Sequence, residues 1–144
     1  MSATKVTDAI VEEIMTNSPD FICLNYANAD MVGHTGDFEA AKKAVHTVDS
    51  CLKDLVEVAL AENYRILIIA DHGNSDYMIN EDGSPNTAHT TNFVPVIYVA
   101  NGIQNKVRIR SGKLADVAPT ILKMMRIEQP IEMTGGSLIN RLGW

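Results

Sequence analysis

The sequence contains few cysteines, no cluster of basic residues and no long apolar run, and each of these absences narrows what the protein can be. Only Cys23 and Cys51 occur among the 144 residues. Cys23 lies in a short apolar run and Cys51 lies in a helical pattern. We therefore expect two buried free thiols rather than a disulfide or a pair of metal ligands.

The charge pattern argues against a polyanionic partner. The formal net charge is −6 and no run of Lys or Arg occurs. A general electrostatic hold on nucleic acid or on an anionic membrane is therefore not expected. A small anionic substrate would need metal ions or local cations for the same reason.

Membrane insertion and secretion are also not expected. The longest apolar stretches, residues 66–70 and 94–100, fall far short of the ~18 residues that a transmembrane helix needs. The first residues run directly into an amphipathic pattern and lack the basic and apolar regions of a secretory signal. We expect a cytoplasmic protein.

The composition is typical of a folded domain. Hydrophobic residues make up 46% of the chain and charged residues 21%, close to the average of globular proteins. A chain of this length usually forms one domain that buries roughly 70% of its unfolded surface, so we expect one core. The sequence shows no internal repeat, low-complexity tract or linker.

The first half of the sequence predicts an α/β fold. Helical spacing of apolar residues predicts a helix over residues 7–15, and an apolar run predicts a buried strand over 21–24. A polar loop over 25–37 follows. A sustained 3.6-residue rhythm predicts a long helix over 38–63, and residues 66–70 form a second apolar run. Strand, helix and strand in this order imply a right-handed parallel crossover.

A long polar loop and three short elements make up the rest. Residues 71–88 form the loop, with a turn at 81–85 and a candidate short strand at 77–79. Long loops of this kind usually carry function.

The elements after this loop are two strands and a helix. The first strand is expected at 94–99, with Pro95 at its start or at a sheet edge, because proline donates no backbone hydrogen bond. A short strand is expected at 107–109. Pro119 suits the first turn of a following helix.

Aspartate and histidine residues gather at the ends of the predicted strands. Asp30 and His34 lie four residues apart beyond the first strand, a spacing that places both side chains on one side of a helical turn. Asp71 and His72 follow the second strand directly, and His89 precedes the third. Ligands of open α/β sheets bind outside the carboxyl ends of the strands. We therefore expect the first two clusters to converge.

These five residues predict a metal centre. Carboxylate and imidazole ligands suit Mn²⁺ or Zn²⁺, whereas Ca²⁺ and Mg²⁺ prefer oxygen alone. Five such residues exceed what one catalytic ion usually takes from protein, and two ions roughly 3.5–4 Å apart could clamp a phosphoryl group. Aspartate and histidine also gather in loops simply because they are polar, and Gly33, Gly36 and Gly73 suit turns as well as close approach to a metal. The repeated placement beside buried strands favours the metal site.

Longer motifs indicate a family. Residues 28–37, 70–74 and 87–95 closely resemble the C-terminal part of cofactor-independent phosphoglycerate mutases, which belong to the alkaline phosphatase superfamily. The resemblance extends to residues 114–120 and 133–139 and so covers nearly the whole chain. It implies a three-layer α/β/α fold with a mostly parallel sheet, alkaline-phosphatase-like but incomplete.

The resemblance also implies an activity and a ligand set. The family interconverts 3-phosphoglycerate and 2-phosphoglycerate in glycolysis and gluconeogenesis, through a phosphoserine intermediate. It uses no 2,3-bisphosphoglycerate and usually has two Mn²⁺ ions. By resemblance, Asp30, His34 and His89 hold one ion, and Asp71 and His72 hold the other. The native metal stays open, because Zn²⁺ and Co²⁺ share these ligand types.

Parts of the family's enzyme are missing from this sequence. The resemblance assigns residues 1–144 to the C-terminal portion of the metal-binding phosphatase-like domain. The N-terminal portion, with the nucleophilic serine and a further aspartate ligand, is absent, and so is the inserted phosphotransferase domain that binds phosphoglycerate. We therefore expect no catalytic nucleophile here, the rest of the same polypeptide as partner, and no activity from the chain alone.

Neither Ser75 nor His46 is expected to take part in the chemistry. Ser75, beside the second metal motif, is expected to be a loop residue, and His46 on the long helix a solvated or capping histidine. Phosphopentomutases and phosphodiesterase-like hydrolases share the Asp-His-Gly signature, although residues 28–37 and 88–92 favour the phosphoglycerate mutase. A third hypothesis is a non-catalytic metal-binding or interaction module.

Overall fold

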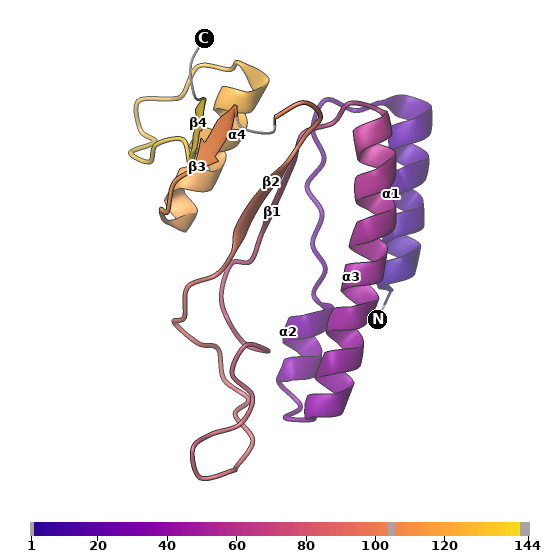
Figure 1. The fold of residues 1–144 in the computed structure, drawn as a ribbon, viewed down its shortest axis with the longest axis vertical. Coiled ribbons are helices and arrows are strands. Elements are labelled where there is room, and N and C mark those ends of the chain that lie inside the picture. The colour runs from indigo at the N-terminus through magenta and orange to yellow at the C-terminus, as the bar shows by residue number, and fades with distance from the viewer. Residues whose placement is uncertain (1, 104–105, 142–144) are drawn as a thin grey trace. The chain divides into compact units, whose positions relative to one another are not determined.

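The chain divides into two compact units rather than forming the single core expected from its length. The computed structural model describes residues 2–103 and 106–141 (Figure 1). Unit 1 is Met1–Ile97 and unit 2 is Tyr98–Trp144. All five predicted metal-binding residues lie in unit 1.

Three helices form one side of unit 1. They are α1 (Ala3–Asn17), α2 (Asn28–Gly33) and α3 (Phe38–Ala61), and both α1 and α2 pack against α3. The helices predicted from periodicity, α1 and α3, are confirmed. The start of α3 is fixed by the Asp37 carboxylate, which accepts a hydrogen bond from the Ala40 amide at 2.9 Å.

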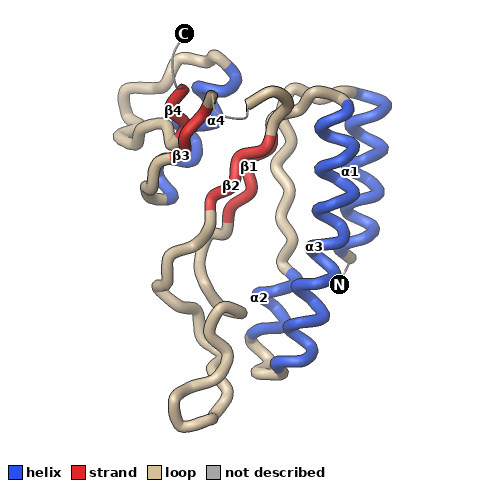
Figure 2. The backbone as a smooth tube through the Cα atoms, in the orientation of Figure 1, coloured by secondary structure: helices blue, strands red, loops and turns tan. Residues whose placement is uncertain are grey.

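The strand expected at residues 21–24 is not formed. This stretch is a loop between α1 and α2 (Figure 2), and none of the described strands pairs with it. A strand needs a neighbour that completes its backbone hydrogen bonds, so the predicted parallel crossover is also absent. Cys23 is consequently exposed, which corrects the expectation of burial, whereas Cys51 is buried, and both thiols are free.

The polar loop expected at residues 25–37 contains α2, which the sequence pattern missed. A helix of six residues is too short to show a 3.6-residue apolar rhythm. Its packing against α3 stabilises a segment that would not be helical in isolation. The expectation of an irregular loop was therefore wrong over Asn28–Gly33.

Strands β1 (Ile66–Ile69) and β2 (Val96–Val99) form a two-stranded sheet. Both match predicted strands, and Pro95 directly precedes β2 as expected. The candidate strand at 77–79 is reduced to one isolated bridge, between Ile79 and Pro85. The turn predicted at 81–85 is present, with Gly83 at a φ of 81°.

Unit 2 contains a small antiparallel sheet and a helix. β3 (Val107–Ile109) pairs with β4 (Ile139–Arg141), and a 3-10 turn, η1 (Leu114–Asp116), leads into α4 (Val117–Met125). Pro119 lies in the first turn of α4, as predicted. β4 was not predicted, because three residues give too little alternation to recognise.

The α/β class is confirmed, and the small sheets of few strands agree with the incomplete alkaline-phosphatase-like domain that the resemblance implied. Among the described residues, no helix is both long and apolar enough to cross a membrane.

Asp116 is the buried polar centre of unit 2, with 5% of its surface exposed. Its Oδ1 accepts a hydrogen bond from the Gly136 amide at 2.8 Å, and its Oδ2 accepts one from the Lys113 amide at 3.1 Å. Arg110 Nη2 lies 3.5 Å from Oδ2. These amides, and then the neighbouring cations, hold the pKa of Asp116 below its usual value.

We expect Asp116→Asn to lower the unfolding temperature of the chain at pH 7, because the variant loses a charged acceptor. The folded-state pKa is lowered, so the stabilisation is complete above the unfolded pKa of about 3.9 and is lost as the pH falls through the folded pKa. In circular dichroism melts, the difference between wild type and variant should shrink as the pH is lowered below about 4. A constant difference down to about pH 2 would contradict this assignment.

Candidate metal centre

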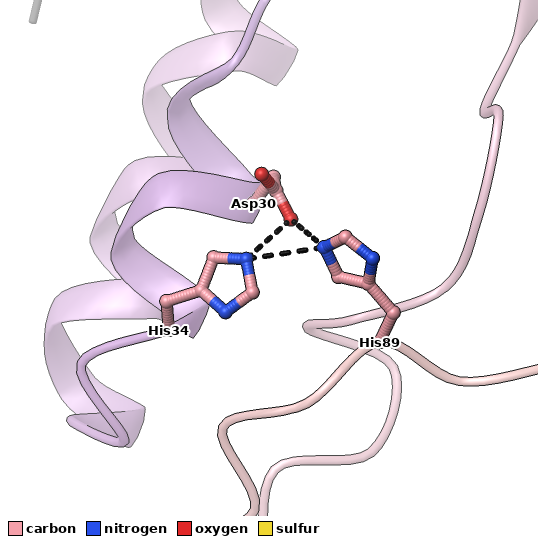
Figure 3. A group of neighbouring side chains, drawn as sticks. All are labelled: Asp30, His34 and His89. Carbon is pink, nitrogen blue, oxygen red and sulfur yellow. Dashed lines mark hydrogen bonds and ion pairs between the residues drawn. The ribbon is translucent and has the colours of Figure 1, made fainter.

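The candidate centre begins at α2, which carries two of the predicted ligands. Asp30 lies within α2 and His34 is its C-cap residue, with the His34 amide donating to the Asp30 carbonyl at 3.1 Å. The two side chains therefore lie on the same side of the turn, and Asp30 Oδ1 is 3.3 Å from His34 Nε2 (Figure 3). The geometry inferred from their spacing is confirmed.

The other three residues lie on the segment that connects β1 to β2. Asp71 and His72 follow β1, and His89 lies on the stretch that returns toward β2. This segment has an outgoing arm that follows β1 and carries His72, and a returning arm that leads to β2 and carries His89. An antiparallel bridge joins the two arms, with the Thr90 amide donating to the Gly73 carbonyl at 2.8 Å. This bridge places the rings of His72 and His89 in a stack with centroids 3.7 Å apart.

One carboxylate oxygen, Asp30 Oδ1, lies close to three imidazole nitrogens. The Nε2 atoms of His89, His34 and His72 are 3.2, 3.3 and 4.0 Å from it. The Nε2 atoms of His34 and His89 are 3.1 Å apart (Figure 3). One donor atom from each of Asp30, His34 and His89 lies within 4.8 Å of the others. Four of the five predicted residues thus converge.

Asp71 lies at the margin of this group. Its side chain is 81% exposed, and its Oδ1 lies 3.7 Å from His72 Nε2. The pair Asp71 and His72 is therefore adjacent, but only His72 reaches toward Asp30.

Backbone carbonyls fix the tautomers of two rings. His34 Nδ1 lies 2.6 Å from the Thr87 carbonyl oxygen, and His72 Nδ1 lies 3.3 Å from the Gly73 carbonyl oxygen. A carbonyl only accepts, so each Nδ1 carries the proton, and in a neutral ring Nε2 carries a lone pair. These lone pairs face the Asp30 carboxylate. A shared proton or a cation is needed to make such a gathering of acceptors favourable.

Asn74 contacts both Asp30 and His34 and was not assigned a role from the sequence. The residue is 5% exposed. Its Nδ2 donates to Asp30 Oδ1 at 3.0 Å and lies 3.4 Å from His34 Nε2, while its Oδ1 is buried without a partner. The only signal for Asn74 in the sequence was its position directly after Asp-His-Gly. Its contact with Asp30 joins residues 44 positions apart, which leaves no local pattern.

Gly33 is required where α2 meets the second loop. A Cβ atom at this position would collide with the Asn74 side chain and lie 2.9 Å from Ser75 Oγ. Ser75 Oγ donates to the Ala29 carbonyl at 2.8 Å, so Ser75 ties the loop to α2, as expected of a loop residue. His46 lies on α3 and does not belong to the metal-ligand cluster found among the described residues.

Comparison with known proteins defines the class of this chain. Residues 1–129 match the Metalloenzyme superfamily, and the chain belongs to that superfamily. A curated relative is the 2,3-bisphosphoglycerate-independent phosphoglycerate mutase of Bacteroides fragilis, 56% identical over 139 residues, which are 96% of this chain and 27% of the relative. The protein with the same name from Acetivibrio thermocellus is 54% identical over 140 residues, again 96% and 27%.

A solved structure agrees with these relatives. The crystal structure of Leishmania mexicana phosphoglycerate mutase at low cobalt concentration matches with a TM-score of 0.87 and 31% sequence identity. The match covers 99% of this chain and 29% of that one. The chain therefore spans little more than a quarter of the length of the proteins that it resembles.

We expect Gly33→Ala to destabilise the chain, because the added methyl group overpacks the contact with Asn74 at a cost of roughly 1–3 kcal/mol. Helix propensity alone would favour alanine by about 1 kcal/mol, so the two effects have opposite signs. Urea unfolding monitored by circular dichroism measures the outcome. A stabilised variant would show that α2 does not approach the loop this closely.

Proposed function

We propose that this chain carries most of the divalent-metal ligands of a 2,3-bisphosphoglycerate-independent phosphoglycerate mutase, which interconverts 3-phosphoglycerate and 2-phosphoglycerate. The observation that carries the proposal is the convergence of imidazole nitrogens on Asp30 Oδ1. The names of the relatives supply the reaction.

The spacing of the donor atoms fits a metal ion. Ligand atoms bound about 2.0–2.2 Å from one Zn²⁺ or similar ion lie roughly 3.0–3.6 Å from one another. The three distances among Asp30, His34 and His89 are 3.1, 3.2 and 3.3 Å. The mixed carboxylate and imidazole set also suits a transition metal better than Ca²⁺ or Mg²⁺.

We assign the ligands to two ions. Asp30, His34 and His89 would hold the first, and Asp71 with His72 would contribute to the second. Mn²⁺ is the proposed native ion, with Zn²⁺ and Co²⁺ as alternatives. When bound, such ions neutralise charge on phosphoryl oxygens and lower the pKa of an attacking oxygen.

The chain's own residues prepare this site in two ways. The Thr87 carbonyl keeps the Nε2 lone pair of His34 directed inward. The Asn74 amide donates to Asp30 and orients its carboxylate.

The net charge of −6 leaves no surplus of cations for a phosphoglycerate, so substrate binding would depend on the metal and on the rest of the polypeptide. The rest of the polypeptide would also supply the nucleophilic serine, which we place outside this chain.

The ligand assignment predicts the effect of single substitutions on metal binding. In calorimetric titrations with MnCl₂, His34→Ala should weaken affinity by more than the roughly 10–100-fold typical of outer-shell changes. His46→Ala removes an exposed histidine from α3, outside the cluster, and should leave affinity unchanged. Equal affinities for wild type and His34→Ala would refute the assignment.

The reaction is tested in a chimera, because the chain alone is expected to be inactive. The matching 139 residues of the Bacteroides fragilis mutase would be replaced by this chain, and 3-phosphoglycerate isomerisation would be followed in an enolase-coupled assay with Mn²⁺. We expect an active chimera that loses activity with His89→Ala. A folded, metal-binding chimera without activity would favour a non-catalytic metal-binding module. Activity on pentose phosphates alone, measured in a longer polypeptide that contains this chain, would favour a phosphopentomutase.

A further inference from the structure

Asp76 connects the two arms of the segment between β1 and β2. Both of its carboxylate oxygens accept from Thr90 Oγ1, at 3.2 and 3.1 Å, and Oδ2 also accepts from Asn92 Nδ2 at 2.6 Å. Both donors lie on the arm that carries His89. Asp76 itself lies on the arm that carries His72, so one carboxylate ties one arm to the other.

The carboxylate of Asp76 also lies against the backbone next to His72. A Cβ atom at Gly73 would lie 2.6 Å from Asp76 Oδ1 and would collide with Thr90 Oγ1. This close approach coincides with the backbone bridge between Gly73 and Thr90. His72 and His89 are the immediate neighbours of these two bridged residues, and their rings form the 3.7 Å stack.

The charge of Asp76 strengthens its link between the two arms. Its hydrogen bonds, first that of Asn92 and then that of Thr90, hold the pKa of the carboxyl below its usual value. Hydrogen bonds to a charged acceptor are stronger than those between neutral groups. They hold Thr90, the residue that follows His89, and His89 itself lies outside any helix or strand.

We propose that Asp76 is a positioning residue, which sets the distance of His89 from His72 and Asp30 and thereby the affinity for the metal, without being a ligand. This proposal rests on the metal site proposed above. It adds a residue that joins the two arms through Thr90 and Asn92. Such a residue influences metal affinity from outside the ligand set.

Manganese titration of the full chain tests the proposal. Asp76→Ala should weaken Mn²⁺ binding by about 10–100-fold, and Asp76→Asn should lose less, because the amide oxygen still accepts from Thr90 or Asn92. The matched control is Asp82→Ala, which removes an exposed carboxylate of the same loop whose hydrogen bonds come from Ser84. Affinity should be unchanged in the control. Unchanged affinity in Asp76→Ala would overturn the proposal.

Pairing through Thr90 is tested with a double-mutant cycle. Thr90→Val removes the hydroxyl donor and should also weaken Mn²⁺ binding. In combination with Asp76→Ala it should add little, because both substitutions break the same contact. Fully additive losses would show that Asp76 acts by another route.

Two further readouts separate positioning from general destabilisation and from failure of the metal site. At saturating Co²⁺, the visible absorption spectrum should differ between Asp76→Ala and wild type, because His89 is displaced in the ligand set. In the metal-free chain, the nuclear Overhauser contact between the His72 and His89 rings should weaken in Asp76→Ala and persist in Asp82→Ala. If no metal binds even the wild type, the ligands of this chain alone do not hold the ion, and the ring contact alone decides the role of Asp76. A ring contact that survives in Asp76→Ala refutes that role.

Discussion

The crowding of hydrogen-bond acceptors around Asp30 Oδ1 is the constraint on which the rest of unit 1 depends. A carboxylate oxygen 3.2 and 3.3 Å from two imidazole nitrogens is favourable only when a proton or a cation lies between these acceptors. The polypeptide must hold each ring from outside the cluster. Carbonyls at Thr87 and Gly73 do so for two rings, and Asn74 does so for the carboxylate.

The helices provide the rigidity that this arrangement needs. α2 has only six residues and would be unstable alone, but it packs on the 24-residue α3. The buried residues of α3 include Ala41 and Ala44. The turn between the two helices leads directly from His34 to the N-cap Asp37, so the end of the site and the start of α3 are one structural feature.

Apolar periodicity was sufficient to predict α1 and α3, and apolar runs were sufficient to predict β1 and β2. Both strands are only partly buried, whereas the sequence suggested buried strands. The strand-end argument predicted only that Asp30 and His34 would meet Asp71 and His72, and it relied on a strand at 21–24 that is not formed. The family motifs, not strand positions, grouped His89 with Asp30 and His34. Residues 21–24 do not form a strand, because an apolar run does not by itself provide a partner strand for backbone hydrogen bonds. Asn74 and Asp76 escaped notice because their partners lie at sequence separations of 44 and 14–16 residues, which no local pattern encodes.

The long separation between the two halves of the cluster also sets an order of events in folding. His34 and His89 are 55 residues apart in sequence, with all of α3 and β1 between them. Their encounter requires closure of that long loop, which is slow compared with helix formation. A nascent chain that has formed only α1 to α3 presents two of the converging side chains and cannot assemble the group. Metal capture would consequently stabilise the completed unit and not its precursors, and would draw the folding equilibrium toward the closed state by mass action.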